Sequence, residues 1–144
     1  MKLSRASSYA LHAVAFMAGQ KDSTRPVPSH HIAAARGIPD RFLLKVLKPL
    51  VSARVLFSIK GPNGGYRLAR PADQIMLLDV LEAVDGPIRG QAPLPEKDNG
   101  PLNHKLEAVC KQVAGQVRER FEKVRLSELV AGKGKKPDRA TDRR

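Results

Sequence analysis

A tight, basic, glycine-rich turn between two short apolar runs most constrains what this chain can fold into. Residues 60–68 read KGPNGGYRL and lie where the apolar runs 55–59 and 66–69 meet. Such runs on either side of an Asn-Gly turn predict a β-hairpin with positive charge at its tip. Two short predicted helices with a glycine between them come directly before it. Helix, turn, helix and basic hairpin together are typical of a winged helix-turn-helix DNA-binding domain.

The charge of the chain supports a polyanionic partner. Its 144 residues suffice for one domain with a modest core, and the formal net charge is +12. Residues 1–70 hold 12 Lys and Arg against 2 Asp and Glu, a net charge of +10, whereas residues 71–144 hold 14 against 12, a net charge of +2. A polyanion, either nucleic acid or an anionic membrane surface, is therefore expected to dock on the N-terminal half, and the predicted helix-turn-helix and hairpin make double-stranded DNA the expected partner. No apolar run is long enough for a membrane span, and a single cysteine fits a cytoplasmic protein.

Apolar periodicity predicts a mainly α fold with one small β-hairpin at residues 55–70. Ser4 or Ser7 is expected to cap the first helix, Ser29 to cap the second, and Gly37 to end it. Pro49 is expected to kink the third helix near residues 45–49. The predicted helices span residues 7–19, 30–36, 39–53, 75–84, 102–123 and, as a short turn, 127–131.

Four regions follow from this pattern: a winged helix-turn-helix domain at 1–85, a Pro- and Gly-rich loop at 86–101, a dimerisation helix at 102–131 and a disordered basic tail at 132–144. The long helix carries a narrow apolar seam with charges on its other faces, which suits a partner helix better than a globular core. The predicted interface residues are Leu106, Val109, Val113, Val117 and Phe121.

The helix at 39–53 is predicted to be the recognition helix. Its core face would consist of Phe42, Leu43, Val46, Leu47 and Leu50. The opposite face could reach guanine edges, phosphates or a thymine methyl. The alternative for the helix is a charged face that is only solvated, and the alternative for the hairpin is an ordinary loop. The scarcity of acidic residues in this half of the chain favours DNA binding for both. The predicted DNA-binding residues are Ser29, Arg41, Leu44, Lys45, Lys48, Lys60, Asn63, Gly64, Tyr66 and Arg67.

The chain contains no nucleophile–base signature, phosphate-binding loop or dinucleotide fingerprint, so no catalytic residues and no enzyme activity are predicted. His104 and Cys110 lie six positions apart, on different faces of one helix, which is poor geometry for a metal site. Cys110 is interpreted as a buried packing thiol beside the seam. No metal site and no cofactor are predicted.

Several stretches resemble one family of bacterial winged helix-turn-helix transcriptional regulators, the IscR/NsrR type. They are MKLS at 1–4 with Tyr9-Ala10, Ile32-Ala33, the wing at 60–69, LLDVLEAVDGP at 77–87 and LSELV at 126–130. The resemblance covers about residues 1–131. It implies a homodimer built on the long helix, a palindromic operator and a role as a repressor. It also implies that Lys60 takes the place of a family arginine that enters the minor groove.

The chain departs from this family at the sensor. Many members bind an iron–sulfur cluster through three cysteines in the loop before the long helix, and here that loop has none. Pro101 stands where the third cysteine is expected, whereas His104 matches a histidine that is the fourth ligand in some members. We therefore expect no cluster. The expected trigger is a small-molecule effector where the 86–101 loop meets the first helix, ranked ahead of modification of Cys110.

Two other functions remain compatible with these residues. One is a sequence-indifferent nucleic-acid-binding or architectural protein that uses the same basic half and tail. The other is a sensor whose main role is to bind a small ligand or a partner protein. A ratio of affinities for operator and random DNA separates the first from a regulator, because both would bind phosphates.

Overall fold

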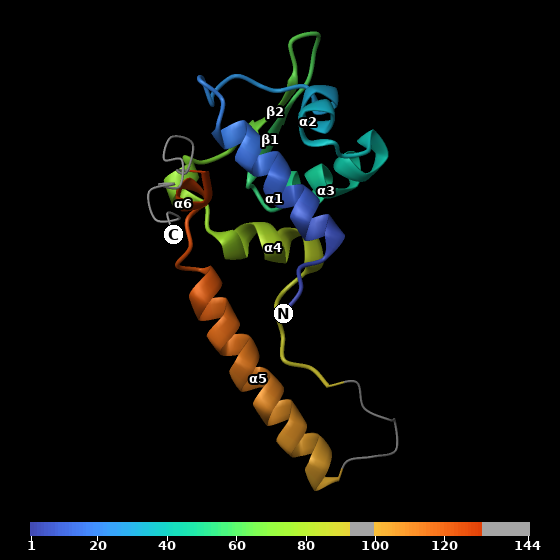
Figure 1. Ribbon diagram of the computed structural model, residues 1–144, viewed down its shortest axis with the longest axis vertical. Helices are drawn as coiled ribbons and strands as arrows, with labels where there is room; N and C mark the ends of the chain where they lie inside the picture. Colours follow the sequence, from blue (N-terminus) through green and yellow to red (C-terminus); the bar gives the residue numbers. More distant parts are fainter. Residues whose placement is uncertain (93–99, 131–144) are drawn as a thin grey trace, which may run out of the picture.

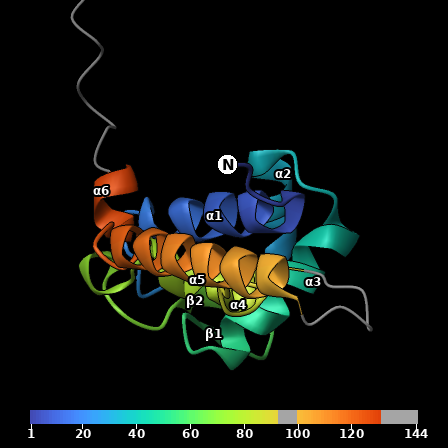
Figure 2. The same ribbon diagram turned by 90° about the horizontal axis from the view of Figure 1, so that it is seen from below.

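The computed structural model describes residues 1–92 and 100–130 (Figure 1). Helices α1 to α4 and the hairpin gather into one body, from which α5 projects (Figures 1 and 2). The predicted fold, mainly helical with a small hairpin, is confirmed. In chain order the elements are α1 (Arg5–Ala18), α2 (Ser29–Arg36), α3 (Asp40–Ser52), β1 (Leu56–Ile59), β2 (Gly65–Leu68), the 3-10 helix η1 (Ala72–Gln74), α4 (Leu77–Asp85), α5 (Pro101–Phe121) and α6 (Leu126–Val130).

The hydrophobic core lies between α1, α2, α3, α4 and the inner face of the hairpin, and α6 adds Leu126 to it. Each helix turns the same face inward every three or four residues, so its apolar positions meet there. Phe42 was predicted to join this core but is 46% exposed, because it lies at the edge of the α3 face beside the Tyr9 ring, with centroids 6.4 Å apart. The buried core includes Ala10, Ala13, Val14, Met17, Ile32, Ala33, Leu43, Val46, Leu47, Leu50, Leu56, Leu68, Val80 and Leu126.

Helix α3 continues past Pro49 and ends in a left-handed turn. Pro49 lies inside the helix although it lacks the N–H that would bond to the preceding turn. At the C-terminus the N–H of Val55 donates to the carbonyl of Leu50 at 3.0 Å, and Arg54 between them has φ of 59°. This is the hydrogen-bond pattern of a Schellman cap, with arginine in a position that glycine usually occupies. The turn directs the chain into β1.

A segment from the α1–α2 loop completes the sheet beside the hairpin. Within the hairpin, Leu56 pairs with Leu68 and both face the core. On the other edge of β2, Val27 and Tyr66 exchange two backbone hydrogen bonds of 2.8 and 2.9 Å. Gly65 makes this approach feasible: its φ is 152°, and an added Cβ would lie 2.3 Å from the carbonyl oxygen of Val27. Strand β2 is thus hydrogen-bonded to a neighbour along both of its edges.

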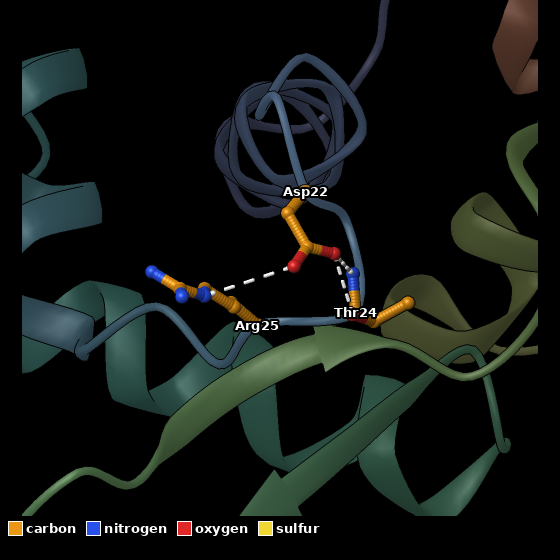
Figure 3. Close-up of polar contacts among 3 residues, drawn as sticks. All are labelled: Asp22, Thr24 and Arg25. Carbon is orange, nitrogen blue, oxygen red and sulfur yellow. Dashed lines mark hydrogen bonds and ion pairs between the residues drawn. The ribbon is translucent and has the colours of Figure 1, made fainter.

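The α1–α2 loop is braced by Asp22 (Figure 3). Thr24 donates to one Asp22 carboxylate oxygen from its hydroxyl, at 2.5 Å, and from its N–H, at 3.0 Å. Arg25 Nε lies 3.7 Å from the other oxygen. The hydrogen bonds from Thr24, and secondarily the charge of Arg25, hold the pKa of Asp22 below its usual 3.8. This local turn carries the chain to Val27 and the sheet.

Several helix ends differ by a residue or two from the prediction. Of the two predicted caps of α1, Ser4 and Ser7, the structure has Ser4: its hydroxyl oxygen accepts a hydrogen bond from the N–H of Ser7 at 3.0 Å. Ser29 does not cap α2, because it is the first helical residue and follows Pro28. Gly37 ends α2 with φ of 63°, which confirms the predicted stop.

The chain after α5 returns to the main body. The N–H of Leu77 donates to the carbonyl of Val124, and the N–H of Leu126 to that of Ile75, both at 2.8 Å. These bonds place α6 against the segment that precedes α4. The predicted tail at 132–144 lies outside the described residues. Among the helices in the described ranges, none is long and apolar enough to cross a bilayer.

Candidate nucleic-acid interface

The outer face of α3 presents a group of long, exposed side chains. Arg41, Leu44, Lys45 and Lys48 are all exposed, whereas the opposite face of the same helix is buried. Leu44 is 50% exposed, unusually open for a leucine at the centre of a helix. Because α3 is the second helix of the helix-turn-helix, this face is the one that enters a major groove in that motif. Ser29 is half-buried at the start of α2.

An exposed phenylalanine supports one of these cations. Lys45 Nζ lies 5.7 Å from the centroid of the Phe42 ring. A cation at this distance from an aromatic face is attracted to it by about 0.5–1 kcal/mol at an exposed site. Phe42 therefore limits the directions that the Lys45 side chain takes. Sequence periodicity did not reveal this role, because Phe42 lies beside the core positions of the helix and was predicted to be buried.

The tip of the hairpin carries Lys60 and Asn63, both exposed. The turn is closed by the N–H of Gly64, which donates to the carbonyl of Gly61 at 2.9 Å. A Cβ on Gly64 would lie 2.1 Å from the carbonyl oxygen of Ile59, so glycine is required here by the turn itself. The two exposed polar side chains are thus held on a tightly closed loop.

Two further predicted contacts lie farther back along the hairpin. Tyr66 is half-buried and packs against the hydrophobic core. Arg67 pairs across the hairpin with Phe57, and its guanidinium carbon lies 5.1 Å from the centroid of that ring. Phe57 is itself 44% exposed. The second exposed phenylalanine of this half therefore also supports a basic side chain, a pairing that only the strand register reveals.

Helix α5 exposes most of its predicted seam. Leu106, Val109 and Val113 are 44%, 56% and 50% exposed. Val117 and Phe121, nearer the main body, are half-buried. The only buried residue in this helix is polar, Asn103, so the helix contributes no apolar side chain to the buried core of its own chain.

A family model described as "Rrf2: Iron-dependent Transcriptional regulator" matches residues 3–132. The chain belongs to the Rrf2 family. This Rrf2 protein is 34% identical over 137 residues to a protein of Mycobacterium tuberculosis named as an HTH-type transcriptional regulator, a match that covers 92% of this chain and 83% of that protein. It is 32% identical over 130 residues to a similarly named protein of Aquifex aeolicus, covering 85% and 86%.

Solved structures agree on the fold. The global cysteine regulator CymR of Bacillus subtilis superposes with a TM-score of 0.71 at 24% identity, over 91% of this chain and 97% of that one. IscR of T. potens superposes with a TM-score of 0.69 at 22% identity, over 92% and 88%. The family match over residues 3–132 and the 34% identity to the M. tuberculosis protein confirm the predicted family resemblance. This Rrf2 protein is a DNA-binding transcription regulator.

Iron, which the family description names, does not fit the donor atoms of this chain. An iron–sulfur cluster requires roughly four thiolate or imidazole ligands. The sequence contains one cysteine, and the 86–101 loop contains no cysteine or histidine. Within residues 1–92 and 100–130, no three His, Cys, Asp or Glu side chains gather closely enough to hold a metal ion. We therefore derive no part of the function through iron.

Cys110 lies in a different setting from the one predicted. It is half-buried and not enclosed as a core thiol. The segment that follows α4 crosses its backbone: a Cβ added to Gly90 would lie 2.3 Å from the carbonyl oxygen of Cys110. This contact joins two segments that are twenty residues apart, and no sequence periodicity signals it.

Proposed function

We propose that this Rrf2 regulator binds a two-fold-symmetric operator as a homodimer and represses transcription from the promoter that contains it. The observation that carries the homodimer is the exposed apolar row on α5. Leu106, Val109 and Val113 expose about half of their surface although they follow one another on one side of a 21-residue helix. A second copy of the same helix would bury that row in a seam of the coiled-coil type.

The DNA contacts proposed for each protomer come from two elements. The exposed face of α3 would enter the major groove, with Arg41 and Lys45 at base edges or phosphates and Leu44 against a thymine methyl. Lys60 at the hairpin tip would bind phosphate or enter the adjacent minor groove. The 12 basic residues against 2 acidic ones in residues 1–70 support this assignment. Repression would follow if the bound dimer blocks polymerase from the promoter.

Selection of bound sites from a pool of random DNA tests this proposal. We expect an enriched inverted repeat with half-sites about 10 bp apart, or a multiple of that spacing, bound by two chains per site. The enriched site should bind on the order of 10³-fold more tightly than random DNA at physiological salt. No enrichment above random sequence would instead favour the architectural alternative. A reporter gene behind the selected site should fall in expression when the protein is present.

A further inference from the structure

We propose that the cleft between residues 88–91 and helix α5 binds a small organic anion that carries carboxylate or phosphate groups, and that this ligand regulates DNA binding. The regulatory half of this statement rests on the proposed function. We call residues 86–92, which follow α4, the strap. The cleft has a volume of about 340 Å³, within the range of small-molecule sites.

The strap is held against α5 by contacts at both sides of the cleft. At one side, Glu82 of α4 accepts a hydrogen bond from the N–H of Ile88 at 2.7 Å and forms an ion pair with Arg118 of α5. At the other, Gly90 crosses the backbone of α5 so closely that an added Cβ would lie 2.2 Å from the nitrogen of Lys111. The cleft is therefore a built feature in which α4, the strap and α5 all participate.

The surface inside the cleft is mainly apolar, and the basic residues that contribute to it favour an anion whose charged groups lie at the rim. Arg89 from the strap and Lys111 and Arg118 from α5 contribute to its lining, and none of the described lining residues is acidic. Arg118 forms an ion pair with Glu82, which does not line the cleft. No lining residue offers a carboxylate to Arg89 or Lys111. Like charges around one concave site repel each other, and an anion between them relieves that repulsion.

The floor of the cleft leaves room for such a ligand. Ala114 and Gly115 line it from α5. A Cβ added to Gly115 would meet no described atom within 4 Å, so the space above this glycine is open. Glycine inside a helix costs roughly 0.5–1 kcal/mol relative to alanine, and helix packing gives no reason for it here.

The proposed dimer seam does not cover the cleft. Successive residues of an α-helix are rotated by about 100°, so the mean direction of the cleft residues 111, 114 and 118 lies roughly a third of a turn from the mean direction of the five seam residues 106, 109, 113, 117 and 121. The cleft is also distant from the proposed DNA contacts, because the hairpin and α5 extend toward opposite ends of the long axis (Figure 1). Neither DNA nor a partner helix in the seam would occupy it.

The position of the cleft provides a route to regulation. Helix α4 packs against α1 and α3 of the DNA-binding body through buried Val80, while α5 would hold the second protomer. The strap and the Glu82–Arg118 pair join these two parts. A ligand that bridges strap and α5 would favour one orientation of the dimer helix relative to α3. Because coupling between two sites is reciprocal, DNA would change the affinity for the anion by the same factor.

Calorimetric titration of the full-length protein with citrate and, separately, with pyrophosphate tests the site, at ionic strength held constant with NaCl. We expect saturable binding of at least one probe, with one site per chain. The probe that binds with the lower dissociation constant shows whether the site prefers carboxylate or phosphate. The double variant Arg89→Gln/Lys111→Gln should weaken this binding at least tenfold. Gly115→Val, which fills the open space without a backbone clash, should weaken it as much. Lys105→Gln removes an exposed charge from another face of α5 and should have no effect.

The absence of saturable binding of both probes would overturn the site. Equal losses in Lys105→Gln and in the double variant would also overturn it, since binding would then reflect general charge. A loss of probe binding in Lys60→Ala would place the anion on the DNA surface instead. The regulatory half requires the affinity for the selected operator to change at least fivefold on saturation with the probe. If the protein selects no operator but still binds the probe at the cleft, the proposed function fails and the anion site stands.

Discussion

Ser7 donates a hydrogen bond from its hydroxyl to the Asp85 carboxylate at 2.5 Å, and this bond joins the first turn of α1 to the last residue of α4. Ser7 is fully buried. Ser4 Oγ lies 2.7 and 2.9 Å from the two oxygens of the same carboxylate. The single acid therefore fixes the N-terminal cap of α1 and the point where the chain leaves the DNA-binding body toward α5.

Replacing Asp85 should destabilise the fold. Asp85→Ala leaves the buried Ser7 hydroxyl without its acceptor, a loss of roughly 1–3 kcal/mol in the free energy of unfolding. Urea unfolding followed by circular dichroism measures it. Asp73→Ala, which removes an exposed carboxylate from η1, serves as the matched control and should leave stability within about 0.5 kcal/mol. Equal effects of the two variants would mean that the Ser7–Asp85 bond adds nothing.

Removing the basic side chains of the hairpin should weaken DNA binding and leave the fold intact. Lys60→Ala and Arg67→Ala together are expected to cost on the order of 1–3 kcal/mol in binding free energy at physiological salt. Fluorescence anisotropy with the selected operator measures the change, with Lys105→Ala on α5 as the control for net charge. Unchanged affinity in the double variant would remove the wing from the interface.

Lys45 should contribute to the choice of bases. Lys45→Gln replaces a group that binds guanine acceptors with one that pairs with adenine, so the preferred sequence should change within each half-site. Repeating the random-pool selection with the variant reveals the new preference. A uniform loss of affinity over all sequences would instead identify Lys45 as a phosphate contact.

A charge in the α5 seam should dissociate the dimer. Val113→Asp places a carboxylate among apolar side chains, and we expect the dimer dissociation constant to rise at least tenfold, or about 1.4 kcal/mol. Sedimentation velocity over a range of concentrations measures it. Ala108→Asp adds the same charge at an exposed position outside the seam and should leave the dimer unchanged. A Val113→Asp dimer as stable as the wild type would refute this interface.

The protein should contain no iron–sulfur cluster when it is purified without oxygen. Two chains offer only two cysteines, and in the described residues no three His, Cys, Asp or Glu side chains gather closely enough to supply the remaining ligands. Visible absorbance no higher than that of buffer, together with metal analysis, checks this expectation. Cys110→Ser should also leave operator affinity unchanged. Visible cluster absorbance that follows DNA affinity would contradict our interpretation of the donor atoms.

Local signals in the sequence determined much of this protein. The apolar periodicity of α1 and α3, the stop at Gly37 and the glycine-rich turn at 61–65 each depend on residues within a few positions, so they predict helices, a cap and a hairpin without reference to the rest of the chain. Charge asymmetry between the two halves is likewise a property of the sequence alone. Together they predict a winged helix-turn-helix domain and its DNA partner.

Tertiary structure alone decided the contacts between distant segments. The pairing of Val27 with Tyr66, the bond from Ser7 to Asp85 and the crossing of Gly90 over Cys110 each join residues twenty or more positions apart. No local pattern marks either partner, because their pairing depends on how the helices pack. The same reason explains Phe42, whose place at the edge of a helix face becomes exposed or buried only when neighbouring elements are in position.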